Sequence, residues 1–166
     1  MVKLKTNLVL SIILALICTY FIVNRIRKTD APELPPLSTL DGRHFDAQEL
    51  DGKVYIISYF QTWCSDCAKE QPQLQQLQER FGRDKLRVLM VSDEPVSKID
   101  TFRTRFRSGL DFYHTSVPLK GPEIGVKHFP TTYLISKKGE VKEVKVEGIN
   151  WYTEKIIKLV DRLINE

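Results

Sequence analysis

Short apolar runs alternate along the chain with stretches that have the periodicity of amphipathic helices. Residues 54–60 and 86–92 are rich in aliphatic and aromatic side chains, which is typical of strands buried in the centre of a sheet. Residues 64–81 and 150–163 place apolar side chains three or four positions apart, which predicts helices that each bury one face. Strands alternating with helices predict an α/β fold with parallel strands.

Two hairpins are expected at the ends of this central pattern. Residues 37–45 carry an Asp-Gly turn signal between apolar positions, which predicts an N-terminal hairpin. Residues 131–136 and 140–147 flank a Lys-Lys-Gly turn, which predicts an antiparallel pair at the edge of the sheet. The expected architecture is a central mixed sheet with helices on both faces and an N-terminal hairpin.

Polar residues indicate where two of the helices begin. Ser97 followed by Asp100 resembles a capping box, which predicts a helix to about residue 108, before a short strand at residues 111–115. Asn150 is the expected N-cap of the last helix.

The N-terminal segment has the composition of a membrane anchor. Residues 8–23 contain no charged residue and are bracketed by lysines and arginines. The run is short for a span of roughly 20 residues, but flanking basic side chains can reach the interface. A buried core helix and a cleaved signal peptide are the alternatives, and no small-x-small cleavage site follows the run. We expect an uncleaved single-span anchor over residues 1–29, which contacts the lipid bilayer through residues 8–23.

The rest of the chain divides into a linker and one domain. Residues 30–36 include three prolines, so this linker is expected to be extended. Residues 37–166 have the length of one domain. The net charge of +4 has its source in residues 1–29, which hold five basic residues and no acid. The remainder is close to neutral, which argues against a nucleic-acid partner.

Cys64 and Cys67 are the candidate catalytic residues. They stand three positions apart at the predicted start of a helix, directly after a buried strand. Backbone N–H groups and the dipole at a helix N-terminus stabilise a thiolate, and a thiolate with a resolving thiol beside it is what thiol–disulfide exchange requires. Half of a zinc site and an inert structural pair are the alternatives. The three histidines lack metal-ligand spacing, and no metal or other cofactor is expected.

Several motifs occur together in a fixed order. Residues 59–67 read Tyr-Phe-Gln-Thr-Trp-Cys-Ser-Asp-Cys, Pro72 follows Cys64 by eight positions, and the segments Phe-Pro-Thr-Thr at 129–132 and Lys-Gly-Glu-Val at 138–141 come later. Together they resemble the thioredoxin superfamily, and more closely its membrane-anchored, TlpA-like thiol–disulfide oxidoreductases. The resemblance covers about residues 37–166 and implies a thioredoxin-like fold.

The resemblance implies a role for each matching residue. Cys64 is expected to be the more exposed, attacking thiol, and Cys67 the buried resolving thiol. Pro130, if cis, would face their disulfide and offer backbone groups to an extended substrate segment. The expected substrate groove comprises Trp63, Phe129, Pro130 and Thr131.

Glu70 is the expected proton-transfer residue, because the membrane-anchored branch has an acid at this place and the residue lies one turn after Cys67 on the same helical face. A solvated helix carboxylate is the alternative. Ser58 stands where thioredoxin proper has a buried acid, which adds weight to Glu70. Asp66 lies inside the motif, where it disfavours the Cys64 thiolate but suits the helix N-terminus.

The expected function is that of a membrane-tethered enzyme that exchanges a Cys64–Cys67 disulfide with protein thiols outside the cytoplasmic membrane, with cytochrome c maturation as a candidate context. The domain is expected to face the periplasm or the cell exterior. Its partners would be protein thiol or disulfide substrates and an upstream membrane or periplasmic electron donor. Reductant and oxidant directions both stay open. The alternatives are a copper-binding chaperone on the same fold and a peroxiredoxin-type peroxidase.

Overall fold

The computed structural model describes residues 14–15, 17–19, 33–148 and 150–166. The chain divides into two units, Met1–Asp30 and Ala31–Glu166, and the described residues of the first unit are helical. Within the described parts of the chain, no helix has the length and apolar composition that a membrane crossing requires. Most of the expected anchor over residues 8–23 lies outside these parts, so the anchor stays a prediction.

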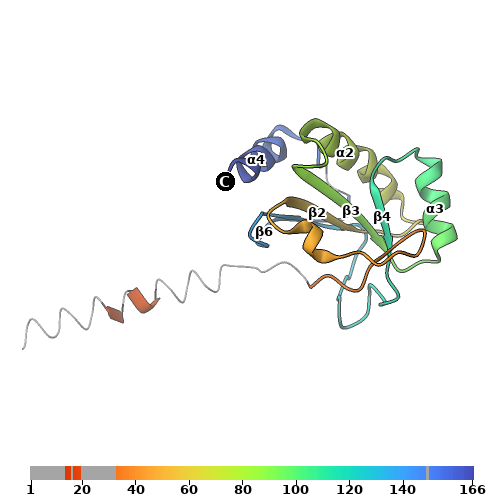
Figure 1. The fold of residues 1–166 in the computed structure, drawn as a ribbon, viewed down its shortest axis with the longest axis horizontal. Coiled ribbons are helices and arrows are strands. Elements are labelled where there is room, and N and C mark those ends of the chain that lie inside the picture. Colours follow the sequence, from red (N-terminus) through yellow and green to blue (C-terminus); the bar gives the residue numbers. More distant parts are fainter. Residues whose placement is uncertain (1–13, 16, 20–32, 149) are drawn as a thin grey trace, which may run out of the picture. The chain divides into compact units, whose positions relative to one another are not determined.

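The second unit is built on a six-stranded mixed sheet with the strand order β1-β4-β3-β2-β5-β6 (Figure 1). Strands β2, β3 and β4 are parallel, whereas β1, β5 and β6 pair antiparallel with their neighbours. The mixed sheet and the β5–β6 hairpin are therefore confirmed. The elements in chain order are β1 (Ser38–Thr39), η1 (Ala47–Leu50), β2 (Val54–Tyr59), α2 (Ser65–Phe81), β3 (Leu86–Ser92), α3 (Val96–Arg105), β4 (Asp111–His114), β5 (Thr131–Ile135), β6 (Val141–Val146) and α4 (Glu154–Asn165).

Two apolar clusters cover opposite faces of the sheet, because successive residues of a strand point to opposite sides. The first joins Val54 and Ile56 of β2 to buried residues of α2, α3 and α4. The second joins Ile57 of β2 to Leu50 of η1 and to the loop between β4 and β5. We call these two sides the helical face and the irregular face.

The prediction of helices on both faces is wrong for the irregular face. Among the described residues, its apolar cluster draws on the 3-10 helix η1 and on irregular chain, and not on α2, α3 or α4. The loop between β4 and β5 is rich in residues that disfavour an α-helix, since proline lacks an N–H and glycine has high backbone entropy. These residues are Pro118, Gly121, Pro122 and Gly125.

Both predicted helix caps are wrong. Pro95 occupies the N-cap position of α3, and Asp100 accepts hydrogen bonds from Arg103 instead of closing a capping box. Thr153 caps α4 through its side chain, three residues after the expected Asn150. The predicted helices exist, but no described side chain caps α3, and the side chain of Asn150 accepts from the backbone N–H of Tyr152 before α4 begins.

The N-terminal hairpin is present only in a reduced form. Ser38 forms an isolated antiparallel bridge with His44, and the two-residue strand β1 pairs mainly with β4. Leu34 of the expected linker packs against the cluster of the irregular face, and Leu37 is buried in that cluster. The end of the linker is therefore part of the folded unit.

Candidate active site

Cys64 and Cys67 form a disulfide at the start of α2. Cys64 is the N-cap residue, and its Sγ accepts a hydrogen bond from the backbone N–H of Cys67 at 3.1 Å. Cys64 is 7% exposed and Cys67 is 1% exposed, so Cys64 is the more accessible of the two. The N–H that meets Sγ would also stabilise a thiolate there once the disulfide is opened.

An aromatic pair and a cis-proline lie at the same end of the sheet as the disulfide. Trp63 is 68% exposed, and its ring meets that of Phe129 edge-to-face, with 6.0 Å between the centroids. The Phe129–Pro130 peptide bond is cis. Thr131 opens β5 opposite Tyr59, the last residue of β2, so the chain before β5 and the chain before α2 meet at this edge.

Thr131 contributes backbone to this edge and not its hydroxyl. The residue is 6% exposed, and its hydroxyl donates a hydrogen bond to the carbonyl oxygen of His128 at 2.7 Å. The His128 ring itself lies on the surface, with Nδ1 3.2 Å from a carboxylate oxygen of Glu147. An extended segment bound here would therefore meet Trp63, Phe129 and main-chain groups.

Glu70 is buried, and the alternative of a solvated helix carboxylate is wrong. The residue is 2% exposed, one turn after Cys67 on the helical face of the sheet. Its Oε1 accepts hydrogen bonds from the hydroxyl of Thr132 and, at 3.4 Å, from that of Ser58. Ser58 and Thr132 are partners across the β2–β5 pair, so two strands together hold the carboxyl of a helical residue.

The environment of Glu70 shifts its acidity to the neutral range. Burial raises the pKa of the Glu70 carboxyl to about 7, because the charged form loses hydration. The hydrogen bonds from Thr132 and Ser58 partly oppose this rise, as does the positive charge of Lys145. The group therefore has comparable populations of acid and carboxylate near neutral pH.

The second carboxyl oxygen of Glu70 and the indole N–H of Trp151 are both buried without a hydrogen-bond partner among the described residues. The indole nevertheless lies close enough to lower the pKa of Glu70 slightly. The ammonium of Lys145 lies over the Trp151 ring, 5.3 Å from its centroid. Residues after β5 thus form part of the surroundings of the acid, which sequence spacing on α2 could not reveal.

Two acids that the sequence reasoning missed anchor the chain just before the disulfide. Asp93 accepts a hydrogen bond from the side-chain amide of Gln61, and Glu94 accepts from the backbone N–H and the hydroxyl of Thr62. Asp93 also accepts from the backbone N–H of Leu119, in the loop of the irregular face. Their position at the carboxyl end of a strand parallel to β2 was the available signal.

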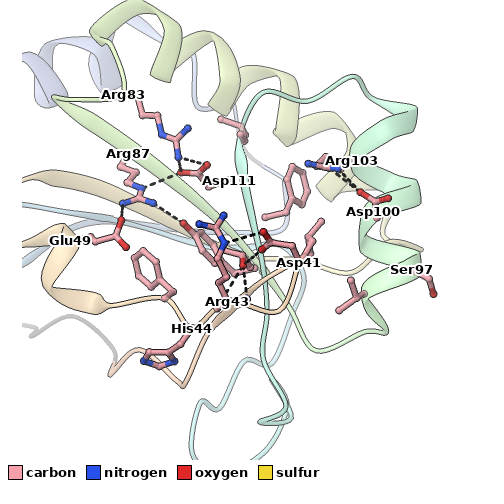
Figure 2. Close-up of a pocket in the computed structure, with 17 residues that line it drawn as sticks. Asp41, Arg43, His44, Glu49, Arg83, Arg87, Ser97, Asp100, Arg103 and Asp111 are labelled. Carbon is pink, nitrogen blue, oxygen red and sulfur yellow. Dashed lines mark hydrogen bonds and ion pairs between the residues drawn. The ribbon is translucent and has the colours of Figure 1, made fainter.

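A cavity of about 900 Å³ lies between α3 and the strands β1 and β4, and its lining does not include Cys64 or Cys67. Figure 2 shows that its charged side chains face one another. Arg87 bridges Glu49 and Asp111, and its guanidinium also donates to the hydroxyl of Tyr113. The charges of this cavity are therefore paired, and the redox site lies elsewhere.

Among the described residues, no group of three or more His, Cys, Asp or Glu side chains is arranged to hold a metal.

Comparisons with known proteins agree with this geometry. The family model described as "AhpC/TSA family" matches residues 28–144. The chain is 30% identical over 116 residues to the thioredoxin-like protein YneN of Bacillus subtilis, covering 66% of either chain. It is 32% identical over 113 residues to the thiol-disulfide oxidoreductase ResA of Geobacillus thermodenitrificans, covering 65% of this chain and 63% of that protein. The matches thus span a little under two thirds of these relatives.

Solved structures show the same fold. A thiol:disulfide interchange protein of the thioredoxin family from Chlorobium tepidum superposes with a TM-score of 0.61 at 25% identity, over 81% of this chain and 97% of that one. A thiol-disulfide isomerase from Corynebacterium glutamicum superposes with a TM-score of 0.66 at 17% identity, over 81% and 95%. From its family match, its fold and its Cys64–Cys67 disulfide, the chain belongs to the AhpC/TSA family within the thioredoxin superfamily, and it is similar in sequence to thiol-disulfide oxidoreductases named ResA.

Proposed function

We propose that the protein is a thiol–disulfide oxidoreductase whose substrates are protein thiols or disulfides. The observation that carries this proposal is the Cys64–Cys67 disulfide at the N-terminus of α2, with a backbone N–H directed at the Sγ of Cys64. Relatives of similar sequence are named thiol-disulfide oxidoreductases, which supports the same chemistry.

In the reducing direction, the Cys64 thiolate attacks one sulfur of a substrate disulfide. A mixed disulfide forms, and the other substrate sulfur leaves as a thiolate that takes up a proton. The Cys67 thiol then loses its proton and attacks the Sγ of Cys64. The intramolecular disulfide forms, the second substrate thiolate leaves, and two electrons have passed to the substrate. The oxidising direction reverses each step.

Glu70 is the proton-transfer group in this scheme. Cys67 is buried, and burial disfavours a thiolate, so its proton needs an acceptor inside the protein. A carboxyl with a pKa of about 7 can accept that proton and release it again near neutral pH. Ser58 and Thr132 hold the carboxyl through hydrogen bonds from two strands.

The substrate segment binds across Trp63, Phe129, Pro130 and Thr131. The exposed Trp63 ring and its Phe129 partner offer apolar surface next to Cys64, and the main chain beside the cis-proline offers hydrogen-bonding groups to an extended chain. Main-chain recognition of this kind accepts many sequences, which suits an enzyme that acts on protein thiols.

The membrane setting of the function is a further part of the proposal. An anchor over residues 8–23 would tether the domain outside the cytoplasmic membrane, where an upstream membrane or periplasmic donor would set the redox state of Cys64 and Cys67. The apolar run and its basic flanks support this setting. Reduction of apocytochrome disulfides to thiols before haem attachment is the candidate context, on resemblance.

One experiment separates this function from its alternatives. The full chain is assayed for dithiol-driven reduction of a model protein disulfide, beside the Cys64→Ser variant. Turnover that needs Cys64 supports the oxidoreductase. Peroxide consumption at enzymatic rates would instead indicate the peroxidase. Tight copper binding in place of thiol–disulfide exchange would indicate the copper chaperone.

A further inference from the structure

The turn after β6 contacts the cis-proline loop. Glu147 and Gly148 form this turn, and both have left-handed backbone, with φ values of 65° and 70°. The backbone N–H of Glu147 donates to the carbonyl oxygen of Pro130 at 3.0 Å, and its carboxylate lies 3.2 Å from Nδ1 of His128. The turn is therefore fixed to the segment that we propose to bind substrate.

The same turn lies against the redox motif through Gly148. A Cβ at Gly148 would stand 2.7 Å from Cβ, 3.1 Å from Cγ and 3.6 Å from Cα of Asp66. Carbon atoms do not approach so closely without displacement, and Cβ is not the free end of a flexible side chain. Asp66 lies between Cys64 and Cys67 in the first turn of α2, so any residue other than glycine must move the turn or the motif.

Two other glycines show that this contact is specific. Gly125 and Gly139 have nearly the same left-handed backbone, with φ values of 69° and 74°, but a Cβ at either position would meet nothing within 4 Å. At those positions glycine is needed only for the backbone angle. At Gly148 it is needed for the angle and also for the closeness of Asp66.

We propose that Gly148 is a positioning residue of the redox site, which lets one turn contact both the Asp66 of the motif and the cis-proline loop and so sets the disulfide in register with the bound substrate segment. This inference rests on the proposed function. Through Glu147 the turn holds Pro130, and through Gly148 it meets the first turn of α2. The two sides of the groove are then aligned by a segment that contains neither cysteine.

A side chain at position 148 should disfavour the disulfide more than the dithiol. The disulfide closes a covalent ring around Asp66, so the motif cannot yield to the added Cβ. The open dithiol lacks this ring and can relax. Gly148→Ala is therefore expected to shift the equilibrium with glutathione at least about fivefold toward the dithiol, as overpacking a fixed contact does. Reduction of a model protein disulfide should slow by about tenfold, because the groove and the sulfurs no longer align.

The experiment compares full-length variants in both assays. Gly139→Ala is the matched control for backbone angle, and it should leave both quantities within about twofold of the wild type. Gly148→Asn keeps the Cβ but tolerates left-handed backbone better, so it should resemble Gly148→Ala. In an Asp66→Gly background, which removes the opposing Cβ, Gly148→Ala should change either quantity by less than about twofold.

Two results would overturn the inference. Gly148→Ala could behave like Gly139→Ala, or its effect could persist undiminished in the Asp66→Gly background. A wild-type protein that does not reduce protein disulfides would instead contradict the proposed function. The glutathione equilibrium, which needs no protein substrate, would still report on the contact between Gly148 and Asp66.

Discussion

Thr132 of β5 donates a hydrogen bond to the carboxyl of Glu70 on α2, although 62 positions separate the two residues. The same carboxyl meets Ser58, at the position where the thioredoxin resemblance has an acid on the strand. The carboxyl thus comes to β2 from the helix, while the strand contributes a hydroxyl. The buried thiol Cys67 and the acid Glu70 then belong to one helix, one turn apart.

The two cysteines should differ in what their loss does. Cys67→Ser should accumulate mixed disulfides with substrate, because Cys64 can attack but no resolving thiol follows. Cys64→Ser should lose turnover altogether and trap none. Non-reducing electrophoresis after acid quenching measures both, and Cys18→Ser, at the exposed free cysteine, is the control that should match the wild type. Trapping by Cys64→Ser instead would reverse the assigned roles.

Replacing Glu70 should slow exchange. Glu70→Gln keeps the shape but neither accepts nor releases a proton, so the rate near neutral pH should fall by roughly ten- to a hundredfold. The measurement is the pH–rate profile for reduction of a model protein disulfide. Asp66→Asn is the matched control, since Asp66 pairs with Lys69 at the surface. An unchanged profile for Glu70→Gln, or a collapse for Asp66→Asn, would move proton transfer away from Glu70.

The same substitution should change how stability depends on pH. The pKa of Glu70 is raised from an ordinary 4.5 to about 7, so the folded protein holds this proton more tightly than the unfolded chain. This proton contributes about 3 kcal/mol to the free energy of unfolding. The contribution is fully present below about pH 4.5 and is lost as the pH rises through about 7. Glu70→Gln should abolish this loss.

Denaturant unfolding of the disulfide form at pH 5 and pH 8 measures the difference between the wild type and Glu70→Gln. Between pH 5 and pH 8, the free energy of unfolding should fall for the wild type but not for the variant, so the variant should become more stable relative to the wild type. A constant difference between the two proteins would contradict a raised pKa for Glu70. Because Glu70 is buried, any loss of packing in the variant should appear equally at both pH values.

The orientation of the chain in the membrane is a separate prediction. A tag placed after Glu166 should be digested by protease added to intact spheroplasts, since the domain is expected outside the cytoplasmic membrane. A cytoplasmic marker protein in the same sample should stay intact until lysis. If the tag is protected until lysis as well, the expected orientation is wrong.

The sequence predicts the regular elements well because their signals are local. The apolar run of β2 and the spacing of Leu74 and Leu77 on α2 are set by neighbours a few positions away, and these elements lie where they were expected. The helix caps were not predictable in the same way. Ser97 and Asp100 have capping chemistry, but Pro95 already occupies the cap of α3.

The environment of the site depends on contacts that the sequence does not encode locally. Spacing placed Glu70 on the same face as Cys67, but its surroundings also include Thr132 of β5 and residues after β5 such as Lys145 and Trp151. The roles of Asp93 and Glu94 depend on β3 lying parallel to β2, which sets their carboxylates beside Gln61 and Thr62. The contact of Gly148 with Asp66 depends on how a distant turn packs against α2.

The residues of the redox chemistry and the loop before the substrate-binding segment lie on different faces of the sheet. α-Helices cover the first face, and mostly irregular chain covers the second. Cys64, Cys67 and Glu70 belong to the helical face, where closely packed α-helices leave little freedom for substitution. The loop that leads to the cis-proline lies on the irregular face and is held there by apolar residues such as Leu119 and Val126 and by the hydrogen bond from the Leu119 backbone N–H to Asp93. Evolution can therefore substitute residues of that loop and change which substrate proteins bind, while the thiol–disulfide chemistry is conserved.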